Sequence, residues 1–427
     1  MVFQPPRGTR DFLPQEMIRR QYVLDTFRRV FELWGYMPLE TPAFEDWALL
    51  SAKSGGGEEI KNEIYYFKDK AERELGLRFD LTVPMARVVA SNPQVPKPFK
   101  RYQMGPVWRY DRPGASRWRE FVQADVDIVG SSSSLADAEV IAVVCNCLKE
   151  LGFDDFLVRI NNRKLMEALF TEIGIEKKRI LDVFRSVDKL EKMGEKAVKE
   201  ELVQKGVAPA KIDKVLELIN SKLGDVKPDS QEAKEALTEL NNVILYVTEF
   251  GYGKSIRPDL SLMRGLDYYT GPVFEMTVGE NKSSVTGGGR YENLVKLFGG
   301  QQTPATGWSI GVDRIVEIMK ERNMFQDKKT LTKIFIVSVG NDLEIRRQGI
   351  GISNKLREIG IACECDLMSR SLSKQLAYAN SQNIPYTIII GAKELEKGIM
   401  KLREMKTGKE RSIRVADISA VRDVLQK

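Results

Sequence analysis

The residues of this chain that could perform chemistry are mainly arginines, aspartates and tyrosines, because the sequence contains no histidine. Without histidine there is no Ser-His-Asp or Cys-His nucleophile system, no imidazole general base and no histidine-ligated metal. Arg, Lys, Asp, Glu and Tyr must then carry any reaction. Chemistry on phosphate groups would depend on guanidinium, which keeps its charge at all physiological pH values.

Four short segments concentrate these residue types. Taken singly, each is a weak signal, because an arginine on a strand usually lies at the surface. The glycine run Gly287–Gly289 is likewise more often a turn than a site. The four segments are Leu77–Pro84 (LRFDLTVP), Gly105–Asp127 (beginning GPVWRYDRP and ending REFVQADVD), Arg264–Gly271 (RGLDYYTG) and Gly307–Arg314 (GWSIGVDR).

A mixed set of strands and helices must position these segments. The proline-rich run Tyr36–Phe44 predicts a strand at a sheet edge or an interface, because proline cannot donate a hydrogen bond in a central ladder. Two extended runs, Lys100–Tyr110 and Phe121–Val129, flank a polar loop and predict a long antiparallel hairpin. Other predicted elements are helices at Gln15–Trp34 and Leu135–Leu151, a strand at Phe156–Ile160, strands within Ile256–Val278 and an entry into a helix within Gly307–Arg322.

Two further stretches differ in character from this framework. Ile175–Lys254 is rich in Lys, Glu, Leu and Val at helical spacing, and predicts an inserted helical module. From Leu331 onward strands and helices alternate, which predicts a separate α/β domain with parallel strands. This last segment holds 17 Lys and Arg against 11 Asp and Glu, an excess equal to the formal net charge of +6 of the whole chain. A basic terminal domain suggests a nucleic-acid partner, although a basic solvated surface gives the same charge.

The composition favours a soluble protein of two or three domains. The chain has 427 residues, of which 42% are hydrophobic and 30% charged. No apolar run approaches the roughly 18 residues of a membrane span, and the first ten residues lack the core of a signal peptide, so we expect a cytoplasmic protein. The cysteines form two C-x-C pairs, Cys145/Cys147 and Cys363/Cys365, which fit a reducing compartment and predict no zinc site.

Together the segments resemble the histidyl-tRNA synthetase family, and the resemblance covers essentially the whole chain. Tyr36–Phe44 resembles the dimer-interface motif of class II aminoacyl-tRNA synthetases, Trp108–Asp127 their second motif and Gly307–Arg314 their third. Arg264–Gly271 and Gly287–Tyr291 resemble two peptides particular to the histidyl group, and are the specific part of the resemblance.

The segment around Asp80 resembles the archaeal and eukaryotic version of the family, since bacterial members tend to carry Glu at this position. The resemblance implies an α+β fold: a class II antiparallel catalytic sheet of six strands with helices, a helical insertion and a C-terminal α/β domain that binds the anticodon. The implied boundaries are residues 1–174 and 255–322 for the catalytic domain, 175–254 for the insertion and 331–427 for the anticodon-binding domain. A homodimer is also implied.

The resemblance implies the activity of a histidine–tRNA ligase. Such an enzyme activates L-histidine with ATP and Mg²⁺ to histidyl-adenylate and pyrophosphate, and then transfers histidine to the 3′ end of tRNA(His). The implied partners are therefore tRNA(His), L-histidine, ATP and a second copy of the chain, with no zinc and no membrane.

The arginines of the four segments match the ATP-binding positions of the family. Arg109 and Arg264 could hold the α-phosphate from opposite sides, since guanidinium groups match phosphate oxygens. In this family the second of these arginines does work that a metal ion does in relatives. Arg314 resembles the arginine that contacts the outer phosphates and stacks on adenine. Arg117 and Arg119 could also meet phosphates or the acceptor end of tRNA, or could belong to a flexible basic loop.

Recognition of histidine is expected to use groups for both ends of the ligand. Neutral imidazole has one donor and one acceptor, so a carboxylate and a hydroxyl can read it completely. Asp127 and Tyr269 match the imidazole-reading positions of the family, although Asp127 could instead be the structural partner of an arginine. The α-ammonium group is matched by Asp80, Thr82 and Gln123. The full implied set is Asp80, Leu81, Thr82, Arg109, Gln123, Asp127, Arg264, Tyr268 and Tyr269 for histidine, Gly287, Gly288 and Gly289 for the pocket floor, and Arg264, Arg109 and Gln123 for catalysis.

Three other functions fit parts of the sequence. The regulatory subunit of ATP phosphoribosyltransferase resembles the catalytic domain, but typically lacks the C-terminal domain and has degraded ATP-binding arginines. A synthetase-like domain that senses uncharged tRNA usually belongs to a longer chain with a kinase. Another class II specificity, such as threonyl or prolyl, is disfavoured by the two histidyl peptides. In this chain Arg109, Arg264 and Arg314 are all present.

Overall fold

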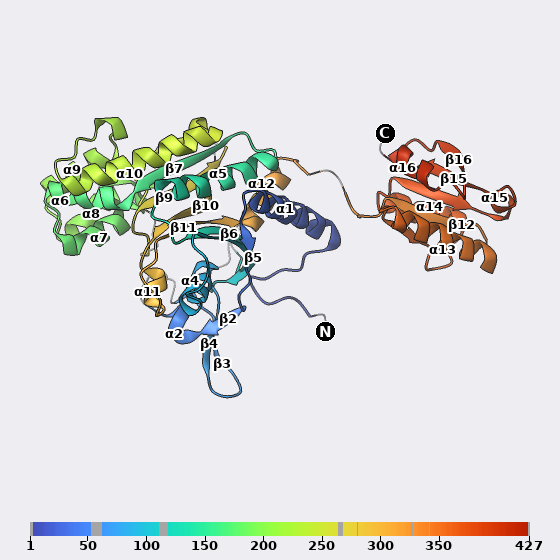
Figure 1. The fold of residues 1–427 in the computed structure, drawn as a ribbon, viewed down its shortest axis with the longest axis horizontal. Helices are drawn as coiled ribbons and strands as arrows, with labels where there is room; N and C mark the ends of the chain where they lie inside the picture. The colour runs from blue at the N-terminus through green and yellow to red at the C-terminus, as the bar shows by residue number, and fades with distance from the viewer. Residues whose placement is uncertain are drawn as a thin grey trace. The chain divides into compact units, whose positions relative to one another are not determined.

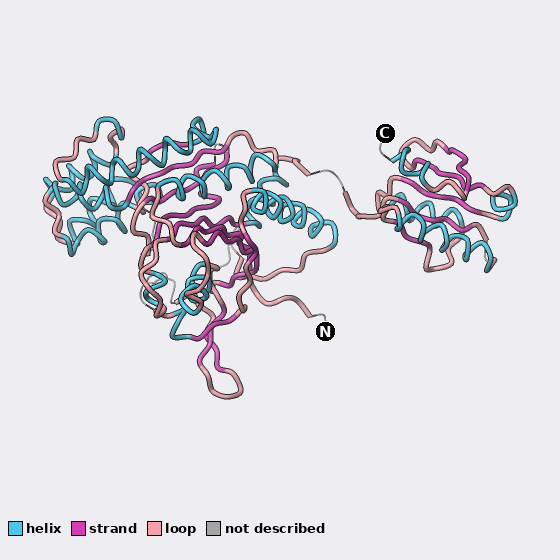
Figure 2. The backbone as a smooth tube through the Cα atoms, viewed as in Figure 1, coloured by secondary structure: helices cyan, strands magenta, loops and turns pink. Residues whose placement is uncertain are grey.

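The computed structural model describes residues 3–52, 62–110, 118–263, 268–279, 281–325, 328–340 and 342–425, with only the backbone of residues 281–284. The described residues form two compact units. The larger unit lies within Met1–Asp11 and Tyr22–Met324, and the smaller one within Phe12–Gln21 and Phe325–Lys427. Each unit is built around its own sheet (Figures 1 and 2).

The larger unit contains an eight-stranded sheet. The six central strands, β5, β6, β11, β10, β9 and β7, pair with one another in antiparallel fashion. The short edge strands pair in parallel, β1 with β5 and β8 with β7. The antiparallel sheet of six strands implied by the class II resemblance is therefore present, with one short strand added at each edge. In spatial order the strands are β1 (Met37–Pro38), β5 (Phe99–Trp108), β6 (Glu120–Val129), β11 (Ala305–Gly311), β10 (Asn281–Tyr291), β9 (Pro272–Val278), β7 (Phe156–Asn162) and β8 (Ile256–Pro258).

The two faces of this sheet differ in chemistry. One face is apolar, with Val126, Trp308 and Phe274 buried on neighbouring strands. Helices α5 (Ser134–Glu150) and α10 (Gln231–Val247) lie over this face, where α5 packs on β6 and β11 and α10 packs on β7 (Figure 1). Because side chains alternate along a strand, the polar residues of β6 must face the opposite side. That opposite face holds the candidate site.

The polar face is partly covered by two short helices. Helix α4 (Thr82–Ser91) packs on α11 (Leu294–Leu297), and both join a buried cluster with Tyr268, Tyr269 and Tyr291. Helix α12 (Val312–Glu321) begins directly after β11 and packs on β6. Helix α1 (Pro14–Leu33) buries Val23, Phe27, Val30 and Phe31.

Several sequence-based predictions are confirmed by these elements. The long hairpin is β5 and β6. The strand predicted at Tyr36–Phe44 is confirmed only for Met37–Pro38, which form the edge strand β1, and Phe44 starts strand β2 of another sheet. Proline is tolerated at this edge because no central ladder needs its missing N–H. One detail was wrong: residues 305–311 form strand β11, and helix α12 starts only at Val312. The glycine run Gly287–Gly289, for which a turn was the alternative to a site, lies inside strand β10.

A second, three-stranded sheet lies in the larger unit, in the order β2 (Phe44–Asp46), β4 (Glu74–Leu77) and β3 (Tyr66–Lys68). Helix α2 (Trp47–Leu50) packs against β2 and β4. This small sheet presents aromatic side chains to solvent, with Phe44 50% exposed and Tyr66 45% exposed.

Between β7 and β8 the chain is helical, as predicted for Ile175–Lys254. Figure 1 shows helices α6 to α9 gathered at one end of α10. Apolar residues at helical spacing form one buried face of each helix, as Ile180, Val183, Phe184 and Val187 do in α7, and this burial stabilises the helices. The helices are α6 (Arg163–Ile173), α7 (Lys177–Val187), α8 (Leu190–Gln204), α9 (Pro209–Ile219) and α10, with short irregular helices η1 (Leu223–Asp225), η2 (Thr248–Tyr252) and η3 (Gly253–Ser255).

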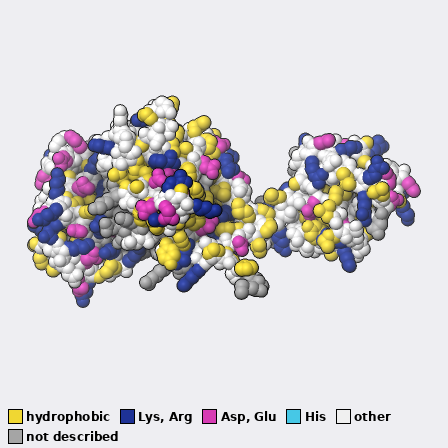
Figure 3. Space-filling view, turned by 90° about the horizontal axis from the view of Figure 1, so that it is seen from below, with side chains coloured by type: hydrophobic (Ala, Val, Ile, Leu, Met, Phe, Trp, Pro, Cys, Tyr) yellow, Lys and Arg dark blue, Asp and Glu magenta, His cyan; other side chains and the backbone are white. Residues whose placement is uncertain are grey.

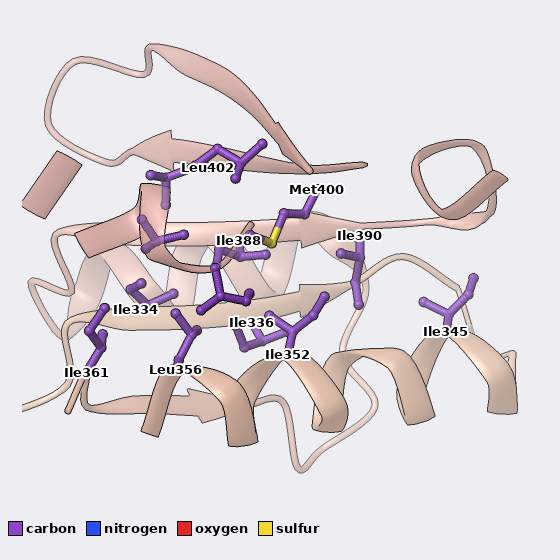
Figure 4. Packing of buried hydrophobic residues seen from close by; sticks show 13 residues of the cluster. Ile334, Ile336, Ile345, Ile352, Leu356, Ile361, Ile388, Ile390, Met400 and Leu402 are labelled. Atoms are coloured by element: carbon purple, nitrogen blue, oxygen red, sulfur yellow. The ribbon is translucent and has the colours of Figure 1, made fainter. Parts of the chain in front are cut away.

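The smaller unit confirms the predicted α/β pattern. Strands β13 (Cys363–Cys365), β12 (Ile334–Ser338) and β14 (Tyr386–Ile390) are parallel, with α13 (Leu343–Glu358) and α14 (Leu372–Ser381) as crossovers. Figure 4 shows apolar side chains of β12, β14 and α13, such as Ile336 and Ile388, meeting in one core. An antiparallel addition was not predicted: β15 (Ile399–Glu404) and β16 (Glu410–Arg414) extend the sheet, with α15 (Ala392–Glu396) and α16 (Ser419–Leu425) beside them in sequence.

The surface carries charged side chains of both signs, and the cysteines are free. On the face seen in Figure 3, Lys and Arg side chains are mixed with Asp and Glu. Cys145 and Cys147 are buried in α5, and Cys363 and Cys365 lie in β13, all as free thiols. None of the described helices is long and apolar enough to cross a membrane.

Candidate functional site

Strand alternation gathers a row of polar side chains on the open face of the large sheet. On β6, Gln123, Asp125 and Asp127 share this face, and all three are buried. Their direct neighbours on β5 are Gly105, Gln103 and Arg101, and those on β11 are Gly311, Ser309 and Gly307. Buried polar groups are costly unless they are paired or bind a ligand, so this row marks a site rather than a core.

Asp127 lies at the centre of a buried network. Its Oδ2 forms an ion pair of 2.6 Å with Nη2 of Arg101, and both side chains are almost fully buried. The Tyr291 hydroxyl donates to its Oδ1. Asp127 therefore has an arginine partner, as in the alternative prediction that Asp127 has a structural role. Its carboxylate oxygens keep further lone pairs, so the ion pair does not prevent it from also accepting a ligand N–H.

The carboxylates of this face have raised pKa values because they are buried. Burial raises the pKa of Asp125 to about 7, against the opposing effect of Arg101, and raises the pKa of Asp80 to about 6. Burial also raises the pKa of Asp127, while Arg101 and Tyr291 act in the lowering direction. Three carboxylates within one buried site favour a cationic ligand group, such as an α-ammonium, over an anionic one.

Asp80, Leu81 and Thr82 lie together at the start of helix α4. The Asp80 Oδ1 accepts from the backbone N–H of Val83 at 3.0 Å, which fixes the carboxyl at the helix N-terminus. Nη2 of Arg101 donates to the Leu81 carbonyl at 3.4 Å. The structure thus brings the start of α4 next to the Asp127 network.

Gln123 presents an acceptor to the same face. Its Nε2 donates to the Ser309 hydroxyl at 2.6 Å, which fixes the orientation of the amide. Its Oε1 is buried and has no hydrogen-bond partner among the described residues. An acceptor held in this way suits an α-ammonium group, which is the ligand group predicted for Gln123.

Tyr268 and Tyr269 are buried beside this network. Their ring centroids are 4.7 Å apart, and Tyr268 also packs edge-on against Tyr291 at 5.8 Å. Burial raises the pKa of Tyr268 well above its usual value, with Tyr269 and Asp80 acting in the same direction. Tyr268 is therefore a neutral hydroxyl that can donate or accept at physiological pH.

Glycines make room on the strands around Asp127. A Cβ atom at Gly307 would lie 1.9 Å from Oδ1 of Asp127, and one at Gly289 would lie 2.7 Å from the Tyr269 ring. Gly287 faces the same side, opposite Ser309. Gly288 faces the other side, where a Cβ would lie 2.1 Å from the Gly307 carbonyl and 2.5 Å from Phe274. Of the predicted pocket floor, Gly287 and Gly289 thus share the polar face, and Gly288 serves packing beneath it.

We expect Gly307→Ala to displace the Asp127 carboxylate, because no alanine methyl group fits 1.9 Å from Oδ1. Overpacking of this kind costs about 1 to 3 kcal/mol of stability. The affinity for a ligand that binds this carboxylate should fall by about tenfold or more, as expected from a loss of about 1.4 kcal/mol in binding. Thermal unfolding measures the loss of stability, and a ligand titration measures the loss of affinity. Gly311→Ala in the same strand is a steric control, since its new methyl would have no neighbour closer than 3.6 Å; equal losses of stability in both variants would contradict the clash.

The predicted ATP-binding arginines that are described lie around this face. The Arg109 Nε donates to the Phe79 carbonyl at 3.0 Å, and its guanidinium lies 5.4 Å from the Phe121 ring centroid. Arg109 acts to lower the pKa of Asp80, so the two groups are close. Arg119 lies over the Tyr110 ring. Arg264 and Arg117 lie outside the described residues.

Arg314 lies in the first turn of α12, as predicted. Its Nε is buried and has no hydrogen-bond partner in the described part of the chain. The preceding Asp313 is fixed by the backbone N–H of Val122 at 2.8 Å and by Arg10 at 3.2 Å, which anchors the start of α12 to β6. This anchoring would hold Arg314 in place for a phosphate.

Two arginines of the motifs have structural partners instead. Arg78 donates to the backbone carbonyls of Thr41 at 2.7 Å and Pro106 at 2.9 Å, tying the proline-rich segment to β5. Arg290 forms a fully buried ion pair of 2.6 Å with Asp137 of α5 on the apolar side of the sheet. Neither lies among the predicted site residues.

Sequence reasoning missed Arg101, Asp125 and Tyr291. The signal for Arg101 and Asp125 was the alternation Arg101-x-Gln103 on one hairpin strand and Gln123-x-Asp125-x-Asp127 on the other. A half-buried strand should alternate polar and apolar residues in this way. Only the pairing register shows that the polar side is the buried one.

These features together define a class of protein. A sheet of six antiparallel strands carries a buried polar face, glycine gaps, and arginines on the hairpin and at the start of the helix after β11. This is the arrangement expected of a class II aminoacyl-tRNA synthetase.

Comparison with known proteins identifies the family within this class. Residues 8–315 match the family described as Histidyl-tRNA synthetase, and residues 333–425 match the Anticodon binding domain. The chain is 38% identical to the histidine–tRNA ligase of Aeropyrum pernix, over 99% of this chain and 98% of the relative, and 40% identical to that of Korarchaeum cryptofilum, over 92% of each. The crystal structure of histidyl-tRNA synthetase from Nostoc sp. PCC 7120 matches with a TM-score of 0.85 at 32% identity, over 98% of this chain and 99% of that one. The chain belongs to the histidyl-tRNA synthetase family.

Proposed function

We propose that this chain is a histidine–tRNA ligase whose amino-acid site is the polar face around Asp127. The reaction joins L-histidine to ATP, releases pyrophosphate, and then transfers histidine from the adenylate to the 3′ end of tRNA(His). The observation that carries the proposal is the buried set of Asp80, Gln123 and Asp127 beside Arg109, in a chain of this family. Full-length similarity to histidine–tRNA ligases, including the anticodon-binding domain, supports this function over the regulatory and sensing alternatives.

The residues of the site have complementary roles in this proposal. Asp127 accepts a ring N–H of the imidazole, and a tyrosine hydroxyl, assigned to Tyr269, serves its other nitrogen. The Gln123 Oε1, Asp80 and Thr82 hold the α-ammonium. The histidine carboxylate then points toward Arg109, which lies near Asp80.

Adenylate formation brings a carboxylate to the α-phosphorus of ATP, so the site must place positive charge on the transferring group. We assign this work to Arg109 and, from the sequence alone, to Arg264. Arg314, Arg119 and Arg117 are assigned to the remaining phosphates and the adenine. Guanidinium groups suit these positions because their paired donors match phosphate oxygens.

Magnesium enters the proposal with ATP. No group of three or more carboxylate or thiol side chains in the described part of the chain is arranged to hold a metal ion. Mg²⁺ is usually bound through substrate phosphates with one or two carboxylates, and it would supply neutralisation of the departing pyrophosphate. We propose no zinc site and a cytoplasmic location.

A homodimer is also part of the proposal. Phe44, Tyr66 and Phe67 of the small sheet are exposed in the single chain. The ring centroids of Phe44 and Phe67 lie 6.2 Å apart, and that of Tyr66 lies 5.0 Å from the ring centroid of Trp47 in helix α2. Met37 on edge strand β1 is 63% exposed. Exposed apolar groups at a sheet edge favour association with a partner, and the proline-rich segment beside them resembles the class II dimer motif.

Pyrophosphate exchange with ATP, measured for each of the twenty amino acids, tests the function. Histidine should support exchange, and the other amino acids should support far less. A chain that exchanges with another amino acid better than with histidine, or with none, is not a histidine–tRNA ligase.

We propose domains at 1–174 with 255–322, 175–254 and 331–427, the last binding the anticodon arm. Deleting residues 331–427 should leave histidyl-adenylate formation largely intact and strongly reduce charging at limiting tRNA. The affinity of the full chain for tRNA should fall as salt rises, because phosphate contacts release counterions. Charging assays with the truncated and full chains measure the difference; equal charging at limiting tRNA would refute the assignment.

A further inference from the structure

Arg101 is the only arginine in direct ionic contact with Asp127 among the described residues, and its side chain is fully buried. One nitrogen, Nη2, reaches both Oδ2 of Asp127 at 2.6 Å and the Leu81 carbonyl at 3.4 Å. The Tyr291 hydroxyl donates to the other oxygen of Asp127. The carboxylate is therefore held by a cation from β5 and a hydroxyl from β10, and its position does not depend on the ligand.

The groups that face Asp127 come from every neighbouring element. Arg101 and Tyr291 contact it directly, and Asp125 on its own strand and Asp80 before α4 add negative charge. Its direct partner on β11 is Gly307, which carries no charge. Burial holds the pKa of Asp80 at about 6 and that of Asp125 at about 7, although Arg101 lowers both. Burial raises the pKa of Asp127 as well, and Arg101 is the first of the groups that lower it, so loss of Arg101 would raise the pKa of Asp127 further.

The protonation state of Asp127 decides which kind of ligand ring it can form a hydrogen bond with. An ionised carboxylate only accepts hydrogen bonds, so it requires an N–H on the ligand ring. A protonated carboxyl carries an O–H, which can donate to a ring nitrogen that has no hydrogen. We propose that Arg101 is a specificity-determining residue of this enzyme, because its buried charge keeps Asp127 ionised and therefore selective for the ring N–H of neutral histidine. This inference rests on the proposed role of Asp127 in reading the imidazole.

The first test is the pH dependence of histidine binding between pH 7 and 8.5, where the imidazole of free histidine is mostly neutral. The Kd of wild-type protein for histidine should change by no more than about twofold across this range, since carboxyls with pKa values of about 6 and 7, as for Asp80 and Asp125, are at least half ionised from pH 7 upward. Arg101→Gln should bind weakly at pH 7 and improve with rising pH by up to about tenfold per unit, because a proton must leave Asp127. Arg101→Lys retains a charge and should restore a flat profile. An Arg101→Gln profile as flat as that of wild type would overturn the inference.

Two further variants assign the pH dependence to Asp127. Adding Asp127→Asn to Arg101→Gln removes the titrating group and the unpaired buried charge, so the profile should become flat. A persisting slope would place the proton on Asp125 or Asp80 and would overturn the inference. Arg290→Gln is the matched control, because Arg290 forms an equally buried ion pair of 2.6 Å with Asp137 on the apolar side of the sheet. It should lose stability and keep a flat profile.

The second test is specificity. β-(2-Thiazolyl)alanine has a ring nitrogen that accepts but no ring N–H, and its ring stays neutral at pH 7. Wild-type protein should prefer histidine strongly in kcat/KM for pyrophosphate exchange. In Arg101→Gln this preference should fall by about tenfold or more, as expected from losing roughly 1.4 kcal/mol of discrimination, and Arg101→Lys should restore it. An unchanged preference would reduce Arg101 to a structural role.

A third test uses wild-type protein, so it remains possible even if the Arg101 variants do not fold. NMR of protein with ¹³C-labelled aspartate carboxyls gives one resonance for each aspartate. The resonance of Asp127 is the one that is missing from the spectrum of Asp127→Asn. In wild-type protein, its chemical shift should be that of an ionised carboxylate from pH 6 to 8. A protonated Asp127 in this range would overturn the inference. Failure of the proposed function has a different signature: wild-type protein would give no histidine-dependent exchange. Failure of the Asp127 role would appear as an unchanged histidine Kd in Asp127→Asn alone.

Discussion

Arg109→Lys should lower the kcat of histidyl-adenylate formation by about 10²-fold or more, which corresponds to roughly 2.7 kcal/mol of transition-state stabilisation. The lysine keeps the positive charge but loses the planar pair of donors. It also loses the Nε hydrogen bond to the Phe79 carbonyl, 3.0 Å long, that aims the guanidinium. A group that acts mainly as the pentavalent phosphorus forms affects kcat more than KM. Pre-steady-state adenylate formation at saturating histidine and ATP measures the effect.

Arg322→Lys is a suitable control for this variant, because Arg322 lies on the same unit in a half-exposed ion pair with Asp155 at 2.8 Å. Its kcat should stay within about twofold of wild type, since exposed ion pairs contribute little. If Arg109→Lys instead shows near-normal kcat with a large increase in the ATP or histidine KM, Arg109 is a ground-state binding residue and its catalytic assignment is wrong.

Much of the fold could be predicted from the sequence where local patterns coincide with tertiary structure. The hairpin β5–β6 and the βαβαβ core of the smaller unit follow from strand alternation and helical spacing in contiguous segments. The order of the large sheet could not be predicted in this way, because β11 lies between β6 and β10 although it comes later in the sequence than both. That order depends on long-range pairing, for which the only sequence-based expectation came from the family resemblance. The β15–β16 hairpin was missed because its strands are rich in charged residues.

The candidate site shows the same division between local and long-range information. Asp80 and Thr82 were expected in the site from their motif, but helix α4, at whose start they lie, was not predicted. Glycine in a sequence more often indicates a turn, so only the motif suggested that Gly287–Gly289 belong to the site. In this sheet Gly307 and Gly289 are instead required by close approach to Asp127 and Tyr269. Arg101 received no role, since only the register Arg101 opposite Asp127 reveals that the two side chains meet.

Asp127→Asn should raise the histidine KM by about 30-fold or more and leave the ATP KM nearly unchanged, because truncating one partner of a buried charged pair typically costs about 2 to 5 kcal/mol. The amide has almost the volume of the carboxylate but offers one acceptor oxygen instead of two, and it leaves Arg101 without the counter-ion 2.6 Å away. Protein stability should fall as well, since an unpaired buried charge costs about 3 to 5 kcal/mol. Pyrophosphate exchange at varied histidine and at varied ATP, together with denaturant unfolding, measures the three quantities.

The loss of stability makes a matched control necessary, and the chain provides one. Asp137 is as buried as Asp127 and forms an ion pair of the same length, 2.6 Å, with Arg290, but it lies on helix α5 on the apolar side of the sheet. Asp137→Asn should therefore lose a similar amount of stability while the folded enzyme keeps its histidine KM. A common loss of stability with an increase in histidine KM only for Asp127→Asn would separate recognition of the imidazole from maintenance of the fold. If both variants keep the wild-type histidine KM, Asp127 is a structural partner of Arg101, and another group must read the imidazole.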